Sequence, residues 1–299
     1  MPRTFGTGGA NVMQQRVMRV GTRESRLAMA QTQLFIEACK RITKETVTYE
    51  VVPMRTEGDL RLDRPLYELD GKGMFISAFE EALLGGEIDV AVHSAKDMDA
   101  TLAEGLEIAA VLPRANPADV LVTLKGTALT ESSVIGTGSL RRKIQMKEQF
   151  GYQSKAIRGN VDTRLDKLKR GEVDGLVLAA AGLERLGLIE KLQQEFTFEY
   201  LDVHTFLPAP AQGIIVAESR TGGPFAGLLS QVNDADTMEC LLMERQFLRE
   251  TGADCKQPVA AYAFRQDGEL RMEAALWENG RRLSAEEIDS RREKRLQGE

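Results

Sequence analysis

The sequence predicts an α/β fold with mixed, mostly parallel sheets arranged in two lobes, followed by a smaller α+β domain. Apolar runs typical of strands alternate with helix-like segments through most of the chain. Two stretches rich in proline and other turn residues, 113–117 and 207–213, interrupt that alternation. Such a pair of crossings is typical of a chain that leaves one lobe and later returns to it. After Gly223-Pro224 a long helix and two strands replace the alternation, which indicates a third domain.

The first lobe is expected to begin with a strand at 17–21 and a long helix that Ser25 caps. We expect the apolar face of this helix to consist of side chains at helical spacing, namely Leu27, Ala30, Leu34, Ala38 and Ile42. The other expected elements of this lobe are a strand at 47–54, a helix at 74–84 that ends at Gly85-Gly86, and a buried parallel strand at 88–92.

The same pattern restarts after Pro113. In order, the second lobe is expected to contain strands at 120–122 and 134–135, a helix at 139–150, a strand at 155–157, a helix at 161–169, a strand at 175–178 and a helix at 179–186. The third domain is expected to contain a helix at 236–249 and strands at 259–264 and 270–276. Its charged tail, 284–299, predicts a solvated helix or a disordered segment. We therefore expect three domains, formed by 17–112 with 213–230, by 113–212 and by 231–299, after a disordered extension at 1–16.

The composition argues against several classes of partner and site. The chain of 299 residues holds 45 acidic and 39 basic side chains, and its net charge of −6 argues against nucleic acid as a main partner. It contains no apolar run of the ~18 residues that a membrane-spanning helix needs, so we expect no membrane partner. Three cysteines and two histidines argue against a disulfide framework and against a metal site, and they favour a reducing, cytoplasmic location.

Polar and charged side chains crowd the end of the strand at 88–92. His93, Ser94, Lys96 and Asp97 follow it directly, and ligands of open α/β sheets bind at the carboxyl ends of strands. A single carboxylate beside a lysine and a histidine is a candidate reaction centre. The alternative is structural: His93 and Lys96 form a hydrogen-bonded pair, and Asp97 caps the next turn.

Arginines gather at the starts of predicted helices. Arg141 and Arg142 follow Ser139, the expected cap of the helix at 139–150. Cations in the first turn oppose the helix dipole, which costs about 0.3–1 kcal/mol each, so we expect these two to bind an anion and to add little to stability. The alternative is a solvated basic turn.

Two further turns repeat this feature. Arg158 and Arg164 flank Asn160 at another strand-to-helix turn, and Arg23 lies just before Ser25. If the sheets of the two lobes face each other, all three turns border one cleft. Such a cleft would bind a molecule with several anionic groups.

Cys255 differs from the other two cysteines. Cys39 and Cys240 lie on predicted helices at apolar positions and are expected in the core. Cys255 lies in a loop beside Lys256, where a thiol acts as a nucleophile or an attachment point, or else is an inert surface group. Lys72, between two glycines, is expected in a loop that either closes over an anion or is simply flexible at the surface.

Taken together, these motifs resemble those of the porphobilinogen deaminase (hydroxymethylbilane synthase) family. The resemblance runs from about Val17 to about Leu276. The motifs that carry it, in chain order, are VGTRES at 20–25, GKGMF at 71–75, VHSAKD at 92–97, GTGSLRR at 136–142, RGNVDTRL at 158–165, LAAAGLERL at 178–186 and the loop of Cys255. The resemblance implies two lobes similar to periplasmic binding proteins and a monomeric, cytoplasmic transferase.

The family implies an enzyme of tetrapyrrole biosynthesis. It condenses four porphobilinogen molecules into hydroxymethylbilane and releases ammonia, on a dipyrromethane cofactor that a thioether joins to a cysteine, here Cys255. Asp97 matches the family's catalytic carboxylate. The resemblance assigns contacts with the cofactor to Ser94, Lys96, Ser139, Arg141, Arg142 and Arg164. It assigns contacts with the substrate to Arg23, Ser25, Lys72, Arg158 and Arg185.

This chemistry agrees with the residues found. Each pyrrole carries two carboxylates, and the planar fork of arginine suits carboxylates. Loss of ammonia leaves a cationic methylene-pyrrolenine, whose charge an ionised aspartate near the pyrrole N–H stabilises. A cationic cleft within an acidic protein is therefore expected.

The chain departs from the family pattern at several positions. Glu68 replaces a usual lysine, Asp70 a usual glycine, Asp99 a usual proline and Gly138 a usual hydroxyl residue. Pro210-Ala211 replaces a common Val-Gly pair, and the final helix is short and highly charged. Two alternatives stay open: a two-lobed anion-binding protein, which leaves the loop cysteine unexplained, and an inactive relative without cofactor.

Overall fold

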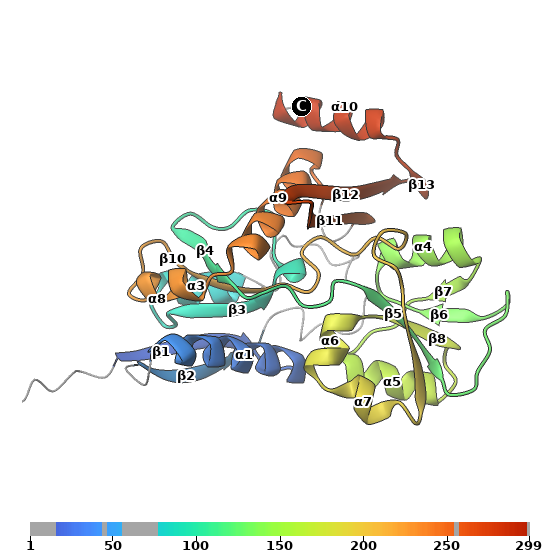
Figure 1. Ribbon diagram of the computed structural model, residues 1–299, viewed down its shortest axis with the longest axis horizontal. Coiled ribbons are helices and arrows are strands. Elements are labelled where there is room, and N and C mark those ends of the chain that lie inside the picture. The colour runs from blue at the N-terminus through green and yellow to red at the C-terminus, as the bar shows by residue number, and fades with distance from the viewer. Residues whose placement is uncertain (1–15, 44–46, 56–76, 254–256, 298–299) are drawn as a thin grey trace, which may run out of the picture.

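The computed structural model describes residues 16–43, 47–55, 77–253 and 257–297. Its strands form two five-stranded sheets and one three-stranded sheet, in the three regions that Figure 1 shows. This arrangement confirms the predicted α/β fold of two lobes with a smaller α+β domain. None of the described helices is both long and apolar enough to cross a membrane.

The first sheet has the strand order β2-β1-β3-β10-β4. Its strands are β1 (Arg16–Arg23), β2 (Val47–Met54), β3 (Val90–Ser94), β4 (Leu106–Val111) and β10 (Ile215–Arg220). β1 runs parallel to β2 and β3, whereas β10 runs antiparallel to β3 and β4. The returning chain thus inserts β10 into the lobe that it left at the first crossing.

Helices cover both faces of this sheet. α1 (Arg26–Thr43) and α8 (Ala226–Val232) pack on one face, together with Val90 and Val92 of β3. α3 (Ser77–Leu84) packs on the other face, together with Ala91. This alternation along β3 is the two-residue period of a strand that is buried on both sides.

The second sheet has the strand order β7-β6-β8-β5-β9. Its strands are β5 (Asp119–Leu124), β6 (Val134–Gly136), β7 (Gln153–Lys155), β8 (Gly175–Ala179) and β9 (Phe196–Tyr200). Its helices are α4 (Leu140–Phe150), α5 (Val161–Lys169), α6 (Ala180–Arg185) and α7 (Leu188–Leu192). β6 is parallel to β7 and β8, and β5 is antiparallel to β8 and β9. In both sheets, the strand that follows a crossing is fourth in the strand order and runs antiparallel to its two neighbours. These strands are β10 in the first sheet and β5 in the second. The strand predicted at 155–157 is wrong by two residues.

The third region consists of β11 (Val259–Gln266), β12 (Glu269–Glu278), β13 (Arg281–Arg282), α9 (Ala235–Thr251) and α10 (Ala285–Leu296). α10 begins with a capping box formed by Ser284 and Glu287, and none of its residues is buried. The charged tail is thus a solvated helix, the first of the two structures expected for it.

The buried face of α1 differs from the predicted one. Phe35, Ile36 and Cys39 face the sheet, whereas Leu34 is 40% exposed. The helix carries two adjacent apolar stripes, and periodicity alone does not tell which one the sheet covers. Ala38 of the predicted face is buried and Ile42 packs against the same core, so the prediction is partly confirmed, whereas Leu34 lines a cavity at the hinge.

The two crossings between the lobes lie against each other. The N–H of Ala115 donates to the carbonyl of Gly213 at 3.1 Å, and a Cβ on Gly213 would lie 2.5 Å from the Ala115 oxygen, so only glycine fits there. Ala211 has a φ of 61°, a left-handed conformation that costs a non-glycine residue about 1–2 kcal/mol. Glu244 of α9 accepts from the Ala211 N–H and pairs with Arg114 (Nη1–Oε1 2.6 Å), which joins the third region to both crossings.

Candidate active site

The two lobes meet at the N-terminal ends of α1 and α5. Arg26, next to the α1 cap Ser25, pairs with Asp162 in the first turn of α5 (Nη1–Oδ1 2.8 Å). Ser25 accepts from the N–H of Ala28 at 3.2 Å, as expected for a cap. This ion pair therefore brings the sequence-predicted turns of Arg23 and of Arg158 and Arg164 near each other at the border between the two lobes.

β3 ends at Ser94, and a short 3-10 turn (Ala95–Asp97) follows. The hydroxyl of Ser94 and the side chain of Gln31 on α1 exchange hydrogen bonds of 2.8 and 3.1 Å. The N–H of Ala95 donates to the carbonyl of Ile214 at 3.0 Å. This turn exposes Asp97, and no side chain or N–H of the described ranges donates a hydrogen bond to its carboxylate. The carboxylate of Asp97 thus has acceptor positions that no described residue occupies.

His93 contributes to the core rather than to the cleft. Its Nε2 lies 3.0 Å from Oε2 of the buried Glu218 on β10, and its ring packs edge-on against Phe79 at 5.1 Å. The alternative of a His93–Lys96 pair is therefore wrong. Strand alternation explains this, because His93 and Ser94 point to opposite faces of the sheet.

Lys96 lies among charges from both lobes. The pKa of Lys96 is lowered to about 8, mainly by burial and in part by the guanidinium groups of Arg142 and Arg141, against the opposing effect of Asp97 and Asp119. Lys96 thus lies close enough to the second lobe to be affected by its charges.

Arg164 shows the same convergence from the other side. Burial lowers its pKa to about 10, Arg142 and Arg158 lower it as well, and Asp97 raises it. Its Nε donates to the carbonyl of Gly159 at 2.8 Å. The structure therefore brings the carboxylate of the first lobe and the arginines of the second lobe into one electrostatic cluster.

Arg141 and Arg142 are buried, with 3% and 6% of their surfaces exposed. Ser139 caps α4 as predicted, and its Oγ accepts from the N–H of Arg142. The two guanidinium groups bind the two oxygens of Asp119, at 2.8 Å from Arg141 Nη2 and 2.7 Å from Arg142 Nη2. The alternative of a solvated basic turn is wrong.

The buried contacts of this pair favour a larger contribution to stability than the helix dipole alone predicts. Arg141 Nη1 donates to the carbonyl of Leu207 at 2.6 Å, and Arg142 Nη1 donates to that of Val177 at 2.9 Å. The helix dipole is a small effect beside these buried, charged hydrogen bonds. Both Nε atoms are buried and have no partner within the described residues, so each arginine keeps a donor for a further acceptor.

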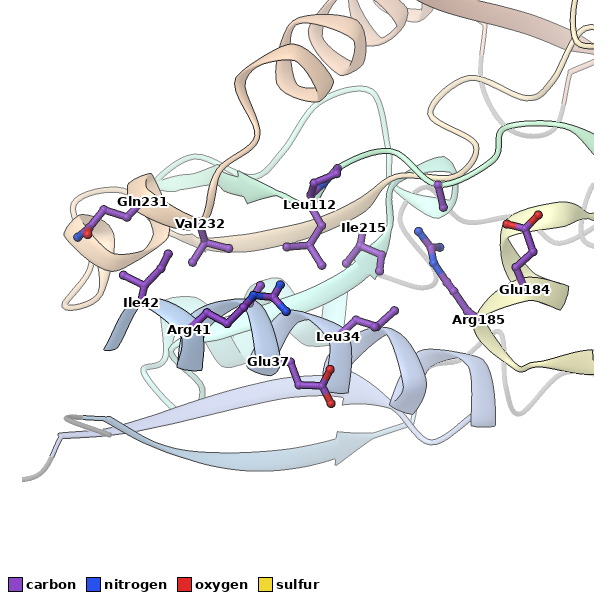
Figure 2. Close-up of a pocket in the computed structure, with 13 residues that line it drawn as sticks. Leu34, Glu37, Arg41, Ile42, Leu112, Glu184, Arg185, Ile215, Gln231 and Val232 are labelled. Atoms are coloured by element: carbon purple, nitrogen blue, oxygen red, sulfur yellow. The ribbon is translucent and has the colours of Figure 1, made fainter. Parts of the chain in front are cut away.

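Arg185 lies at the hinge. A cavity of about 660 Å³ opens there between α1, β10 and α6, and Figure 2 shows Arg185 reaching into it from α6. Its Nη2 donates to the carbonyl of Gly213 at 2.6 Å, and burial lowers its pKa to about 10. The predicted contact of Arg185 with substrate stays a prediction, as do the predicted roles of the other site residues.

Two of the predicted site residues, Lys72 and Cys255, lie outside the described residues. Cys39 and Cys240 are buried, as predicted, and burial raises the pKa of both thiols, that of Cys39 to about 12. Sequence analysis missed Asp119. A carboxylate at the start of an apolar strand, just after a crossing, was the available signal, because a buried charge needs a partner.

Comparison with known proteins identifies the family. The family model "Porphobilinogen deaminase, dipyromethane cofactor binding domain" matches residues 18–224, and "Porphobilinogen deaminase, C-terminal domain" matches 238–295. The porphobilinogen deaminase of Alkaliphilus oremlandii is 42% identical over 257 residues, which are 85% of this chain and 84% of that protein. That of Chromobacterium violaceum is 42% identical over 258 residues, covering 85% of this chain and 82% of that protein.

Solved structures show weaker likenesses. The Bordetella pertussis BvgS periplasmic VFT2 domain is 11% identical, with a TM-score of 0.44, and covers 78% of this chain and 93% of its own. An ancestral arginine-binding protein bound to arginine is 16% identical, with a TM-score of 0.40, and covers 78% of this chain and 97% of its own. Both domain models and the long alignments agree, and the chain belongs to the porphobilinogen deaminase family.

Proposed function

We propose that the cleft between the two lobes is the active site in which this porphobilinogen deaminase makes hydroxymethylbilane from four porphobilinogen molecules. The observation that carries the proposal is the cluster around Asp97. This one exposed carboxylate from the first lobe acts on the pKa of Arg164 in the second, and Arg141 and Arg142 act on that of Lys96. A substrate with two carboxylates per pyrrole needs such fixed cations, and its cationic intermediate needs one anion among them.

Asp97 stabilises the positive charge that develops on the substrate. When the C–N bond of the aminomethyl group breaks, ammonia leaves and the pyrrole becomes cationic. The free α-carbon of the neighbouring pyrrole then forms a C–C bond to the cationic methylene carbon and loses its proton. Asp97 accepts a hydrogen bond from the pyrrole N–H throughout, with acceptor positions that no described residue occupies. A preorganised group of this kind contributes about 3–4 kcal/mol to catalysis.

The residues of the second lobe fit the dipyrromethane cofactor. The unpartnered, buried Nε atoms of Arg141 and Arg142 are donors that await an acceptor, and carboxylates match them. When bound, the cofactor supplies the pyrrole carbon at which the product chain begins. We assign its attachment to Cys255 and its contacts to Ser94, Lys96, Ser139, Arg141, Arg142 and Arg164. We assign substrate contacts to Arg23, Ser25, Lys72, Arg158 and Arg185.

Three further assignments belong to this proposal. We assign the domains to 17–112 with 213–230, 113–212 and 231–299, which agrees with the insertion of β10 into the first sheet. We assign the protein to the cytoplasm, where the thiols of Cys39 and Cys240 stay reduced. We also assign a monomer, with one elution volume and the mass of one chain expected in light scattering.

Intact mass spectrometry of the purified protein tests the proposal. We expect the mass of the chain plus one dipyrromethane, and the mass of the chain alone for Cys255→Ala, which should also be inactive. Cys39→Ala and Cys240→Ala are matched controls that should keep the adduct, because both thiols are buried. An unmodified wild-type chain would favour an inactive relative or an anion-binding protein. An adduct mapped to Cys39 or Cys240 would overturn the assignment of Cys255.

A further inference from the structure

We infer that Asp119 is a positioning residue of this enzyme, which holds Arg141 and Arg142 in the orientation that binds carboxylates and links them to the hinge through Gln212. The inference rests on the proposed function, because it concerns how the proposed anion site is kept in shape. It begins with the contacts that Asp119 makes at the start of β5.

Asp119 is fully buried, and each of its oxygens binds a different arginine. Oδ2 lies 2.8 Å from Arg141 Nη2, and Oδ1 lies 2.7 Å from Arg142 Nη2. Arginine side chains are long and lose considerable rotamer entropy when they are fixed. A shared carboxylate fixes both of them before any ligand arrives, and this preorganisation lowers the entropic cost of binding.

The charges at this site do not balance. One carboxylate faces two guanidinium groups, which are always protonated, so the three side chains together carry a charge of about +1. The other hydrogen-bond partners of the two arginines within the described residues are also neutral, namely the carbonyls of Leu207 and Val177 and the side-chain oxygen of Gln212. A buried excess charge is unfavourable until an anion joins it. An incoming carboxylate supplies that anion, and the two free Nε donors supply hydrogen bonds to it.

Gln212 connects this group to both crossings. Its Nε2 donates to Asp119 Oδ1 at 2.8 Å and to the carbonyl of Pro117 at 2.7 Å, and its own carbonyl oxygen Oε1 lies 3.4 Å from Arg142 Nη2. Pro117 belongs to the first crossing and Gln212 to the second. A change in the angle between the lobes therefore moves the carboxylate of Asp119, and the two arginines move with it.

The test compares holoenzyme variants by kcat, KM and melting temperature. Asp119→Asn keeps the shape and should raise KM for porphobilinogen about tenfold or more, the effect of ~1.4 kcal/mol in binding. In the double variant Asp119→Asn/Arg142→Leu, the loss of kcat/KM in free energy should be smaller than the sum of the two single losses, because Asp119 acts partly through Arg142 and otherwise through Arg141. Asp89→Asn is the matched control. Asp89 is 6% exposed and pairs with Arg19 at 3.0 Å at the other end of β3, so its loss should lower the melting temperature and leave KM unchanged.

Gln212→Met gives a second route that keeps the charges of the site. We expect a rise of KM of about threefold, with the same non-additivity when it is combined with Arg142→Leu. If Asp119→Asn does not fold, the Gln212→Met variant still tests the positioning role of Asp119. Unchanged KM in both variants, or additive losses in the double variants, would overturn the inference. If Arg141→Leu and Arg142→Leu themselves leave KM and the adduct unchanged, the proposed function of the arginines fails as well, and the two failures are thereby distinguished.

Discussion

Each of the two lobes contributes a carboxylate to the proposed site, and the two carboxylates have opposite environments. In the first lobe, Asp97 lies exposed on a short turn after β3, and no described residue donates a hydrogen bond to it. In the second lobe, Asp119 is fully buried at the start of β5, and both of its oxygens are occupied by arginines. A carboxylate with free acceptor positions can respond to charge that develops in a reaction, whereas a saturated one can only hold its partners. This contrast supports the proposal that the first lobe supplies the reacting group and the second the rigid binding surface.

The largest expected effect is at Asp97, on the exposed side of this comparison. Asp97→Asn removes the charge and keeps the shape, and it should lower kcat about 100- to 1000-fold. The melting temperature should stay that of the wild type, since no described hydrogen bond is lost. Turnover assays and calorimetry check both values. Turnover near that of the wild type would show that Asp97 is not the catalytic carboxylate.

Substitutions of the buried arginines in the second lobe should change both stability and activity. Arg141→Leu and Arg142→Leu each leave Asp119 with one arginine in addition to Gln212, so we expect unfolding free energies about 1–3 kcal/mol lower, together with loss of activity or of the cofactor adduct. Denaturant titration and intact mass spectrometry measure these effects. Arg170→Leu is the control from the same lobe, because its pair with Glu172 is exposed. Wild-type stability with lost activity would restore the expectation derived from the helix dipole.

The titration of Lys96 tests this comparison through the pH dependence of KM and of stability. Its pKa in the folded protein is about 8, below the ordinary 10.5, because burial disfavours the charged form. Below pH 8 the lysine is charged and binds carboxylates, so KM should rise as the pH increases through about 8. Stability changes in the opposite direction, since the cost of the buried charge is present below pH 8 and disappears between pH 8 and 10.5.

Lys96→Gln provides the control for that pH dependence. The variant should have a higher KM at neutral pH and no further rise of KM around pH 8. Steady-state kinetics across this range, with a melting curve at each pH, separate the effect on binding from the effect on folding. An unchanged alkaline limb in Lys96→Gln would mean that another group titrates there.

The smallest expected effect lies at the hinge between the two lobes. Ala211→Gly relieves the left-handed backbone at φ 61° and should raise stability by about 0.5–1 kcal/mol, with little change in kcat. Asp267→Gly is the matched control, because Asp267 also has a positive φ of 54° but belongs to a residue type that tolerates it. Equal gains in the two variants would show that the conformation of Ala211 carries no particular strain.

Local signals in the sequence determined most of the fold. The α5 prediction matches in full, Ser139 caps its helix as expected, and the expected helices and strands occur in the expected order. The sequence analysis did not anticipate β4, β9, β10, α7 or α8. These features depend on residues within one or two turns of each other, so a short window contains their cause. Asp97 was found in the same way, from the place of a carboxylate at a strand end.

Only the tertiary structure decided which surfaces are buried and which charges are paired. The sheet covered Phe35 rather than Leu34 on α1, although both belong to apolar stripes of similar quality. Arg141 pairs with the carboxylate of Asp119, which lies 22 residues away in the sequence. Asp119 accepts a hydrogen bond from the side-chain amide of Gln212, which lies 93 residues away. Such partners are chosen by the packing of whole sheets, and no local pattern contains them. Sequence alone therefore identified most of the charged groups proposed for this site but missed Asp119, and the fold determined which of them are paired and which are exposed.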